Sequence, residues 1–510
     1  MQISYRANLT AAEFPLISEF QGRNVIVMGN DQNFSRQANS PKNKDRDVGI
    51  PQVYYCHNVI PTDSGIESIG YQQIVNPPAD TDVSFDDIFF IRDSNGNVGY
   101  FANTTSGRCY VMLSVGLGWI RTTDKAPLTG KPVTVAKVNG ESYIFFGGVG
   151  CFKYNFATNV LDAVTLAGLS IPDIIGISAS SGYMLAYTKN KVIWSSTIDP
   201  TDFLPSLVTG SGGTNIQQLK GDIVACLPQN SGFIVYATEN AVAAIYTGNA
   251  QSPFTYKENV SCGGLSNANL VASDGNSTDH YAYTNAGLQQ VSMLQSQVIY
   301  PQITDFIAGN QFEDFDEATL AFTQLLLSAP MKKKITVVSS RYLVISYGVT
   351  ALTHAILYDM ALARMGKFKI EHVDCFEYVY PSSAVVDNPR RSLGFLQADG
   401  TIKTVVMSYD TTGAQGTVIL GKYQFDRNRY VTLQEVHLES IRKDSVLDVR
   451  LLSTIDGKNT RTESTYLATN LDTYRRYNAN AFGLNHSIVI SGGFNLHSVV
   501  LKLSDSGSVI

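Results

Sequence analysis

VTVAKVNGESYIFFGGVGCFKYNFATNVLDAV, residues 133–164, decides the fold class of this chain. Two strand-like runs flank Asn139-Gly140, a dipeptide typical of tight hairpin turns. A second turn near Gly148 leads into residues 152–156, and the chain leaves that run through the polar segment 157–159. The stretch therefore predicts an antiparallel unit of short strands.

The same plan recurs along the middle of the chain. Short strands rich in aromatic and branched residues begin at residues 88, 143, 183, 233, 281, 342 and 393 (IFFI, YIFF, YMLAY, FIVY, YAY, YLVI and LGFL). A four-stranded propeller blade needs roughly 40 to 50 residues, which matches this spacing. Each unit exposes apolar residues on both faces, so it is stable only when neighbours stack against it and the ring closes. The pattern predicts an all-β chain with a β-propeller of six blades, seven being the alternative.

The two ends of the chain differ from the middle. Residues 30–47 are polar and nearly free of apolar side chains, which predicts a long surface loop that orders against a partner. Beyond Gln424, longer alternating strands separated by turn residues predict a small β-sandwich. We therefore expect an N-terminal segment over 1–80, the propeller over 81–425 and a C-terminal sandwich over 426–510.

One stretch inside the propeller region has the pattern of a helix. Residues 312–328, FEDFDEATLAFTQLLLS, begin with acidic side chains that favour a helix N-terminus, and Pro330 ends the run. We expect a helical insertion between two blades. Lys332, Lys333 and Lys334 follow directly, and we interpret them as a solvated strand entrance rather than a phosphate contact.

Composition narrows the class of function. Hydrophobic residues make up 44% of the chain and charged residues 16%, which suits an assembly with extensive subunit contacts. The formal net charge of −6 gives no general attraction to nucleic acid. The amino terminus has no signal-peptide pattern and no run of eighteen apolar residues occurs, so we expect a soluble protein made in a reducing cytoplasm. The six cysteines lack the spacing of a zinc knuckle, and we expect buried free thiols.

Motifs for ion and phosphate sites are incomplete. The segment 453–458 approaches the Asp-box turn of sialidases but lacks its spacing. The segment 93–97 begins like a calcium loop, yet Val98 and Thr104 stand where that loop needs Gly and Glu. We interpret both segments as hairpin turns. The glycines of 210–213 form a flexible loop without the lysine and helix of a phosphate-binding loop.

Motifs for catalysis are missing as well. The seven histidines are dispersed and form no metal-binding spacing, and no nucleophile elbow of the G-x-S-x-G type occurs. Asp279 and His280 are neighbours whose side chains would point to opposite faces of a strand. We therefore expect no enzyme activity, no catalytic residue, no metal and no cofactor. The sequence singles out no residue as lining a channel or forming an interface.

Four segments of the chain resemble a known protein family. They are NVIPTDSGIESIGYQ (58–72), KVIWSSTIDPTDF (191–203), CGGLSNANLV (262–271) and AILYDMALARMGKF (355–368). In order along the chain they are similar to structural tail proteins of short-tailed, podovirus-type bacteriophages, the tail nozzle or packaged-DNA stabilisation proteins. The last segment departs from the family pattern at Met365, where Trp commonly precedes Gly-Lys. We expect that difference to affect packing rather than role.

The resemblance implies a propeller beside a platform domain that both chain termini form, assembled as a homo-oligomeric ring, a hexamer. It also implies a place in the virion tail, contact with the head-to-tail adaptor, and contact with tail fibres, tailspikes or a tail plug or needle. The ring would retain packaged double-stranded DNA and later let it pass without sequence-specific binding. The acidic balance fits this role, because a polyanion slides past neutral or negative walls, whereas a basic wall would hold it through counterion release.

A glycan-binding or glycan-cleaving propeller at a phage tail tip is the alternative. Aromatic residues such as Trp194, Tyr378 and Tyr380 would then stack on sugars. For each of them a place in the core or in an interface is the simpler interpretation. A secreted enzyme, the third alternative, is disfavoured by the amino terminus.

Overall fold

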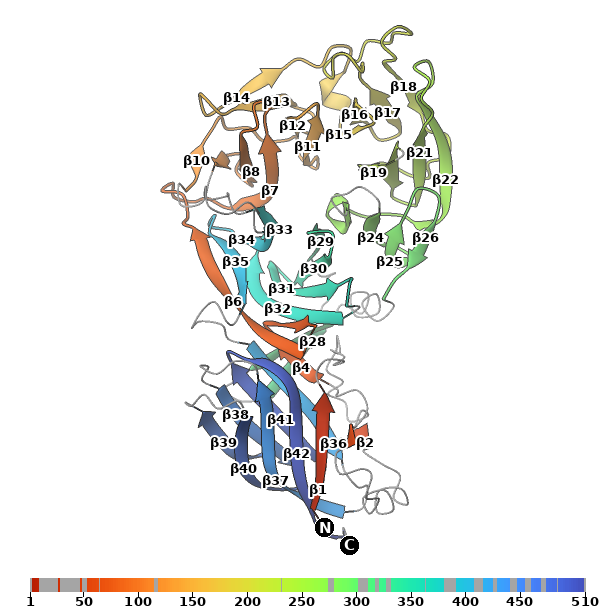
Figure 1. The fold of residues 1–510 in the computed structure, drawn as a ribbon. Helices are drawn as coiled ribbons and strands as arrows, with labels where there is room; N and C mark the ends of the chain where they lie inside the picture. Colours follow the sequence, from red (N-terminus) through yellow and green to blue (C-terminus); the bar gives the residue numbers. More distant parts are fainter. Residues whose placement is uncertain are drawn as a thin grey trace.

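The chain folds into a ring of β-sheets above a β-sandwich, as seen in the computed structural model of the protein (Figure 1). The structure describes residues 2–8, 26–27, 46–47, 53–113 except 64, 118–300 except 231 and 274–278, 311–316, 321–326, 332–379 except 363, 391–407, 416–424, 429–440, 447–454, 460–468 and 474–508 except 484. Most of the polar segment 30–47 lies outside these residues.

The ring is a β-propeller of antiparallel, four-stranded blades. The first three blades are β7–β10 (Phe85–Arg92, Val98–Thr104, Cys109–Met112, Ile120–Arg121), β11–β14 (Val133–Val138, Glu141–Phe146, Gly150–Asn155, Val160–Val164) and β15–β18 (Gly176–Ser180, Tyr183–Tyr187, Lys191–Trp194, Gly212–Asn215). The next three are β19–β22 (Ile223–Gln229, Gly232–Ala237, Asn240–Tyr246, Phe254–Gly263), β23–β26 (Val271–Ser273, His280–Thr284, Gly287–Val291, Ser296–Val298) and β29–β32 (Lys332–Val338, Tyr342–Gly348, Leu352–Asp359, Arg364–His372). Two 3-10 turns, η2 (Ile171–Asp173) and η3 (Ala268–Leu270), precede β15 and β23.

The seventh blade closes the ring with a strand from the other end of the propeller sequence. Its inner three strands are β33 (Asp374–Val379), β34 (Arg391–Leu396) and β35 (Ile402–Met407). The outer strand is β6 (Gly65–Val75), which pairs antiparallel with β35 from Ile69 to Val75. Because β6 directly precedes the first blade along the chain, this pairing holds the first and last blades together.

The hairpin turn predicted in the second blade forms as expected. Asn139 and Gly140 join β11 to β12 with φ of 51° and 85°. Positive φ at both central residues is the requirement of the tight turn that matches strand twist, and Asn and Gly accept it most readily. The sequence pattern therefore predicted both the turn and the strands beside it.

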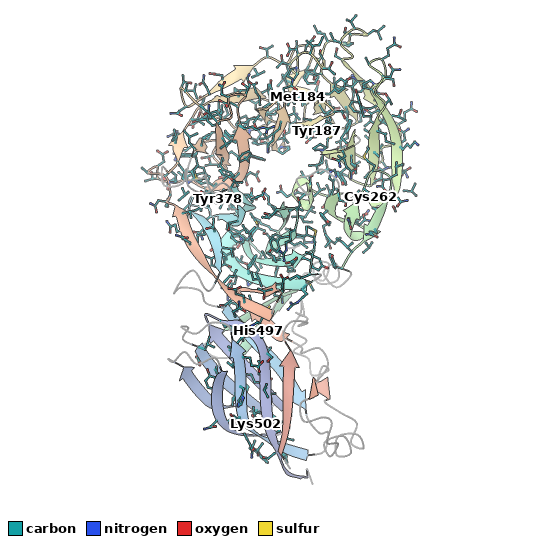
Figure 2. All side chains as sticks on the ribbon, viewed as in Figure 1. Met184, Tyr187, Cys262, Tyr378, His497 and Lys502 are labelled. Carbon is teal, nitrogen blue, oxygen red and sulfur yellow. The ribbon has the colours of Figure 1, made fainter. Side chains whose placement is uncertain are left out.

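The core lies between the blades, as the two-faced apolar pattern predicts. Along β16, Met184 and Ala186 pack toward the second blade, whereas Leu185 and Tyr187 pack toward the fourth, because successive side chains of a strand point to opposite faces. Met184 and Tyr187 are labelled in Figure 2, where side chains crowd the ring. Buried clusters of this kind fill all seven gaps between neighbouring blades in the described structure. The ring is therefore stable only as a closed whole.

The platform is a β-sandwich built from both ends of the chain. One sheet holds β1 (Gln2–Asn8), β3 (Arg46–Asp47), β37 (Arg429–Ser440), β40 (Tyr474–Gly483) and β42 (Asn495–Ser508). The other holds β2 (Ile26–Val27), β4 (Val53–His57), β36 (Gly416–Gln424), β38 (Leu447–Thr454), β39 (Thr460–Ala468) and β41 (Asn485–Gly492). Leu433 and Leu501 of the first sheet and Leu447 and Ile488 of the second meet in one buried cluster. The strand pairing of β1 with β42 thus fixes the amino terminus to the carboxyl-terminal strand.

The structure corrects three expectations, the number of blades and the two domain boundaries. The described ring has seven blades rather than the favoured six, and each of the seven recurrent aromatic strands lies in a different blade. The boundaries at 80 and 425 also shift, since β6 belongs to the last blade and β36 to the sandwich.

The helix expected over 312–328 is wrong. A hairpin of β27 (Gln311–Asp316) and β28 (Ala321–Leu326) occupies that stretch, with Phe312 opposite Leu325 and Phe315 opposite Phe322. Helix propensity is a weak preference that the tertiary context overrides, and here the backbone forms an antiparallel ladder instead. The stretch is still an insertion, because it lies between the fifth and sixth blades.

Candidate functional site at the ring closure

The first strands of the blades face the inside of the ring (Figure 1), and β33 contacts both β29 and β7 there. At the closure, β29, β33 and β7 bring one lysine and two aspartates together. Lys334 Nζ lies 2.7 Å from Asp87 Oδ1 and 2.8 Å from Asp374 Oδ1. The side chains of Lys334, Asp87 and Asp374 are 14%, 23% and 5% exposed. One largely buried ammonium therefore links the sixth, seventh and first blades.

Backbone donors fix the more buried of the two carboxylates. Asp374 Oδ2 accepts a hydrogen bond from the N–H of Ile88 at 3.1 Å, and Oδ1 accepts one from the N–H of Cys375 at 2.7 Å. Burial raises the pKa of Asp374 to about 6, and the attraction of Lys334 opposes this shift without cancelling it. Burial disfavours the charged form of Lys334, but the two carboxylates outweigh that effect and raise its pKa. The cluster therefore places one ammonium group and two carboxyl groups together in a largely buried space.

The run Lys332, Lys333 and Lys334 thus has three different environments. Lys332 is exposed, as a solvated strand entrance predicts. Lys333 is half-buried with Nζ 5.0 Å from the ring centre of Tyr283. Lys334 is paired with both aspartates, which the sequence interpretation missed. The available signal was an aspartate directly before two aromatic runs, Asp87 before IFFI and Asp374 before CFEY.

The opposite ends of the inner strands carry a second, looser charged group. Lys137 at the end of β11 lies with Nζ 4.9 Å from the ring centre of Phe90 on β7. Burial, together with repulsion from Arg92, lowers the pKa of Lys137, while Glu377 of β33 raises it. Glu377 accepts hydrogen bonds from the N–H and the hydroxyl of Ser339, both at 3.0 Å. The inner face of the ring therefore carries mixed charge rather than a basic surface.

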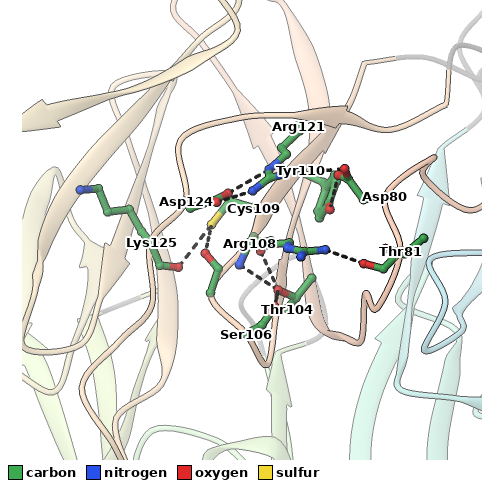
Figure 3. A network of polar contacts seen from close by, with 11 residues as sticks. Asp80, Thr81, Thr104, Ser106, Arg108, Cys109, Tyr110, Arg121, Asp124 and Lys125 are labelled. Atoms are coloured by element: carbon green, nitrogen blue, oxygen red, sulfur yellow. Dashed lines mark hydrogen bonds and ion pairs between the residues drawn. The ribbon is translucent and has the colours of Figure 1, made fainter.

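A further polar network ties the segment before the first blade to that blade (Figure 3). The Tyr110 hydroxyl donates to Asp80 Oδ2 at 2.7 Å, and Arg108 donates to the carbonyl of Thr81 at 2.7 Å. Arg121 pairs with Asp124 at 2.6 Å and lies 3.6 Å from Asp80. Burial, and then hydrogen bonding to Asp80, raise the pKa of Tyr110 to about 12. These contacts position the segment that follows β6 and support the closure of the ring.

The cysteines and His372 are buried within the fold. All six cysteines are free and buried as expected, and burial raises the pKa of the Cys56, Cys109 and Cys151 thiols to about 12. His372 lies between the carbonyl of Ile370 at 2.8 Å and the hydroxyl of Ser346 at 2.7 Å, and burial lowers its pKa to about 4. Within the described residues, no three His, Cys, Asp or Glu side chains are grouped as a metal site would require.

Comparison with known proteins bears on the fold alone. No protein-family model and no curated protein sequence matches the chain. The extracellular domain of a putative hybrid two-component system, BT4673 of B. thetaiotaomicron, aligns over 90% of this chain with 11% identity and a TM-score of 0.39. This chain covers 64% of that structure, which is less than two thirds of its length. The WD40 β-propeller domain of Doa1 aligns over 66% of this chain and 97% of its own, with 9% identity and a TM-score of 0.38.

The segments that resembled ion and phosphate motifs are structural. Asp93 Oδ1 accepts hydrogen bonds from the backbone N–H groups of Asn95 and Asn97 at 3.0 and 2.8 Å, which builds the turn between β7 and β8. Gly212 and Gly213 pair with β17 as part of β18, so half of the loop expected over 210–213 is strand. The segment 453–458 ends β38 at Thr454, and its remainder lies outside the described residues.

His280, Trp194 and Tyr378, three of the residues considered for catalysis or sugar binding, lie inside the blades. His280 is buried, with Nδ1 2.9 Å from the Tyr236 hydroxyl and Nε2 2.8 Å from the carbonyl of Pro228. Trp194 is 8% exposed and Tyr378 is 1% exposed, so neither presents a ring face to a ligand. Tyr380 lies outside the described residues. No described helix is long and apolar enough to cross a membrane.

The joint between ring and sandwich is a continuous strand connection. The first half of β6 pairs with β5 (Val59–Thr62) and with Asn495 and Leu496 of β42. Ser68 and Phe494 exchange hydrogen bonds at 2.8 and 2.9 Å. A Cβ atom on Gly65 would lie 2.0 Å from the carbonyl oxygen of Leu496, so only glycine fits there.

The hairpin of β31 and β32 packs onto the same joint. Arg364 donates to the carbonyl oxygens of Thr62 at 2.9 Å and Gly65 at 3.1 Å. Met365 is partly buried against both the core of the sandwich and the core between the fifth and sixth blades. The joint therefore combines backbone pairing, charged hydrogen bonds and apolar packing, which together oppose hinge motion.

Proposed function

We propose that this chain is a structural virion protein, one sector of the ring-shaped nozzle that ends the tail of a short-tailed phage. The observation that carries the proposal is the joint, in which a propeller is fixed through β6 to a sandwich made from both chain ends. This is the two-part arrangement that the family resemblance implies. A rigid connection suits a wall segment that must keep its shape under load from packaged DNA.

In this proposal the sandwich contacts the head-to-tail adaptor and the propellers surround a channel between subunits. Retained double-stranded DNA leaves through that channel, and tail fibres, tailspikes or a plug bind around it. The net charge of −6 supports the proposal, because a wall with few free cations holds DNA weakly. The mixed charge of the inner propeller face is also consistent with a scaffold role.

The proposal assigns no enzyme activity and no cofactor. Its support lies in the role of the polar groups: the ion pairs of Lys334 and the hydrogen bonds of Tyr110 and His372 connect elements of the fold. Such groups hold blades together. A reactive group needs a lowered thiol pKa or a base beside a nucleophile, and burial raises the thiol pKa values instead.

Electron microscopy of the purified full-length chain, alone and with the adaptor ring of the same phage, tests the proposal. We expect six-fold rings with a central opening, and a mass that corresponds to a homo-oligomer. Monomers in both samples over the micromolar range would refute the proposal. A turnover assay on host polysaccharide distinguishes the glycan alternative, since that alternative requires saturable binding or cleavage.

A further inference from the structure

One loop of the third blade exposes an unusual group of large apolar side chains. The loop joins β17 to β18 over residues 195–211, and we call it the 195–211 loop. Within it Ile198 is 78% exposed, Leu204 55%, Leu207 74% and Val208 90%. The other exposed large apolar side chains of the described chain are spread over the first, second, fourth, fifth and sixth blades and the sandwich. Single exposed apolar residues are ordinary, but four in one loop form a patch.

Internal hydrogen bonds hold the 195–211 loop in one shape. Ser196 Oγ accepts from the N–H of Ile198 at 3.0 Å, and Ser206 Oγ accepts from the N–H of Val208 at 3.2 Å. Trp194 Nε1 donates to the carbonyl of Gly210 at 2.8 Å, which fixes the end of the loop. The conformational entropy lost on docking is therefore small, which favours specific binding.

A buried anchor and a neighbouring segment support the loop from below. Phe203 is 1% exposed and fills the gap between the second and third blades. The N–H of Ala167 donates to the carbonyl oxygen of Thr201 at 2.9 Å, and the carbonyl oxygen of Ala167 accepts from the N–H of Phe203 at 2.9 Å. The apolar side chains are thus held outward on a packed base.

The charge around the four exposed side chains narrows the class of molecule that can bind them. From Val192 to Leu219 the chain has no Lys or Arg, while Asp199 and Asp202 lie within the loop. A nucleic-acid phosphate or an anionic lipid would meet negative charge there and gain no cationic contact. The complementary surface is therefore an apolar protein surface with a neutral or basic rim.

The size of the patch fits a subunit contact. The four side chains expose on the order of 500 Å² together, and a stable interface buries about 800 Å² on each partner. A contact of two copies through the loop and its surroundings would therefore reach the ordinary size. In Figure 1, β17 and β18 lie on the part of the ring remote from the sandwich, so this contact is separate from any contact that the sandwich makes.

We propose that the 195–211 loop docks onto a second copy of this chain. The inference rests on the proposed ring, in which each copy presents one surface to its neighbour and a different surface to the next. The loop supplies one of these two surfaces. It meets a less acidic apolar surface of the neighbouring copy, because loop against loop would place four aspartates together.

Sedimentation velocity and native mass spectrometry of three full-length proteins test this inference. They are the unmodified chain, the double variant Ile198→Asp/Val208→Asp, and Val260→Asp as a matched control. Val260 is 88% exposed on β22 and lies outside the loop. We expect the double variant to weaken self-association at least tenfold, while the control assembles as the unmodified chain does. Thermal unfolding of all three should agree, because the changed side chains are exposed.

The outcomes separate this inference from the proposed function. Rings formed equally by the unmodified chain and the double variant would overturn the docking role and leave the nozzle proposal standing. A closed dimer that the double variant loses would support docking and refute the ring. Monomers of the unmodified chain at all concentrations would overturn the docking to a second copy, and an equal loss in the control would overturn the assignment to this loop.

Discussion

Replacing Lys334 by methionine removes the ammonium that links three blades and keeps most of the side-chain volume. The Asp87 and Asp374 carboxylates, which flank Nζ at 2.7 and 2.8 Å, would then lack their cation. Removing one partner of a buried ion pair costs about 3–5 kcal/mol, because the remaining charge stays buried and uncompensated. Asp374 is 5% exposed, so water screens it little. We expect the free energy of unfolding of the ring to fall by about 3 kcal/mol at pH 7.5.

The loss of unfolding free energy caused by Lys334→Met should be smaller at lower pH. The folded protein raises the pKa of Asp374 to about 6 from 3.8, so it binds that proton more tightly than the unfolded chain does. The stability from this proton is fully present below pH 3.8 and is lost as the pH rises through about 6. Without Lys334 the folded pKa rises further, because the opposing attraction is gone. The difference between variant and unmodified chain should therefore be smaller at pH 5.0 than at pH 7.5.

Urea unfolding followed by tryptophan fluorescence measures this loss of stability at the contact between the first and last blades. Trp119 donates to the carbonyl of Gly400 at 2.6 Å and so reports on the contact of the first and last blades. Lys332→Met is the matched control, since Lys332 is exposed in the same strand, and it should change stability by less than about 0.5 kcal/mol. If Lys334→Met does not fold, Asp87→Asn tests the same cluster with a smaller loss of about 1–2 kcal/mol. A Lys334→Met protein as stable as the control, or a deficit that does not shrink at pH 5.0, would refute the reasoning.

Three further predictions concern the joint and the core. Gly65→Ala should strain the joint, because the added Cβ would lie 2.0 Å from the carbonyl oxygen of Leu496. We expect faster cleavage between ring and sandwich in limited proteolysis, and unchanged cleavage would contradict the close fit. Met365→Ala should lower stability by about 1–2 kcal/mol in urea unfolding and Met365→Leu by less, since Met365 packs against two cores; equal losses would argue against a packing role. The six buried thiols should stay unreactive toward a thiol reagent in the folded protein and all react in denaturant, and rapid labelling of any one in the folded state would contradict its burial.

The sequence predicted the blades because their signals are local. A run such as YIFF flanked by turns identifies a buried strand without reference to the rest of the chain, and Asn139-Gly140 identifies its turn. The closing strand β6 carried no such signal. Its partner β35 lies more than three hundred residues away, and only the end of the ring defines the pairing. The error at 312–328 has a different cause, since β27 and β28 pair as a local hairpin in a stretch whose residues also suit a helix.

The cluster of Lys334, Asp87 and Asp374 could not be predicted either, because its members are far apart in the sequence. Asp87, Lys334 and Asp374 belong to three blades, and each looks like an ordinary surface residue at a strand entrance. The ring brings the entrances of neighbouring inner strands together, so a charge at one entrance can meet a charge at the next. The repeat read from the sequence does not reveal the pairing, because Asp87 directly precedes its recurrent strand, whereas Lys334 and Asp374 lie one strand earlier in their blades.

Two of the four segments that resemble tail nozzle proteins meet at the joint. The first of them, 58–72, forms β5 and β6, and the last, 355–368, forms much of β31 and β32. They touch where Arg364 donates to Thr62, and a Cβ on Gly366 would lie 2.5 Å from the carbonyl oxygen of Val59. A third segment, 191–203, runs from β17 into the 195–211 loop. The remaining segment, 262–271, lies between the fourth and fifth blades, so the four segments divide between the joint and connections within the ring.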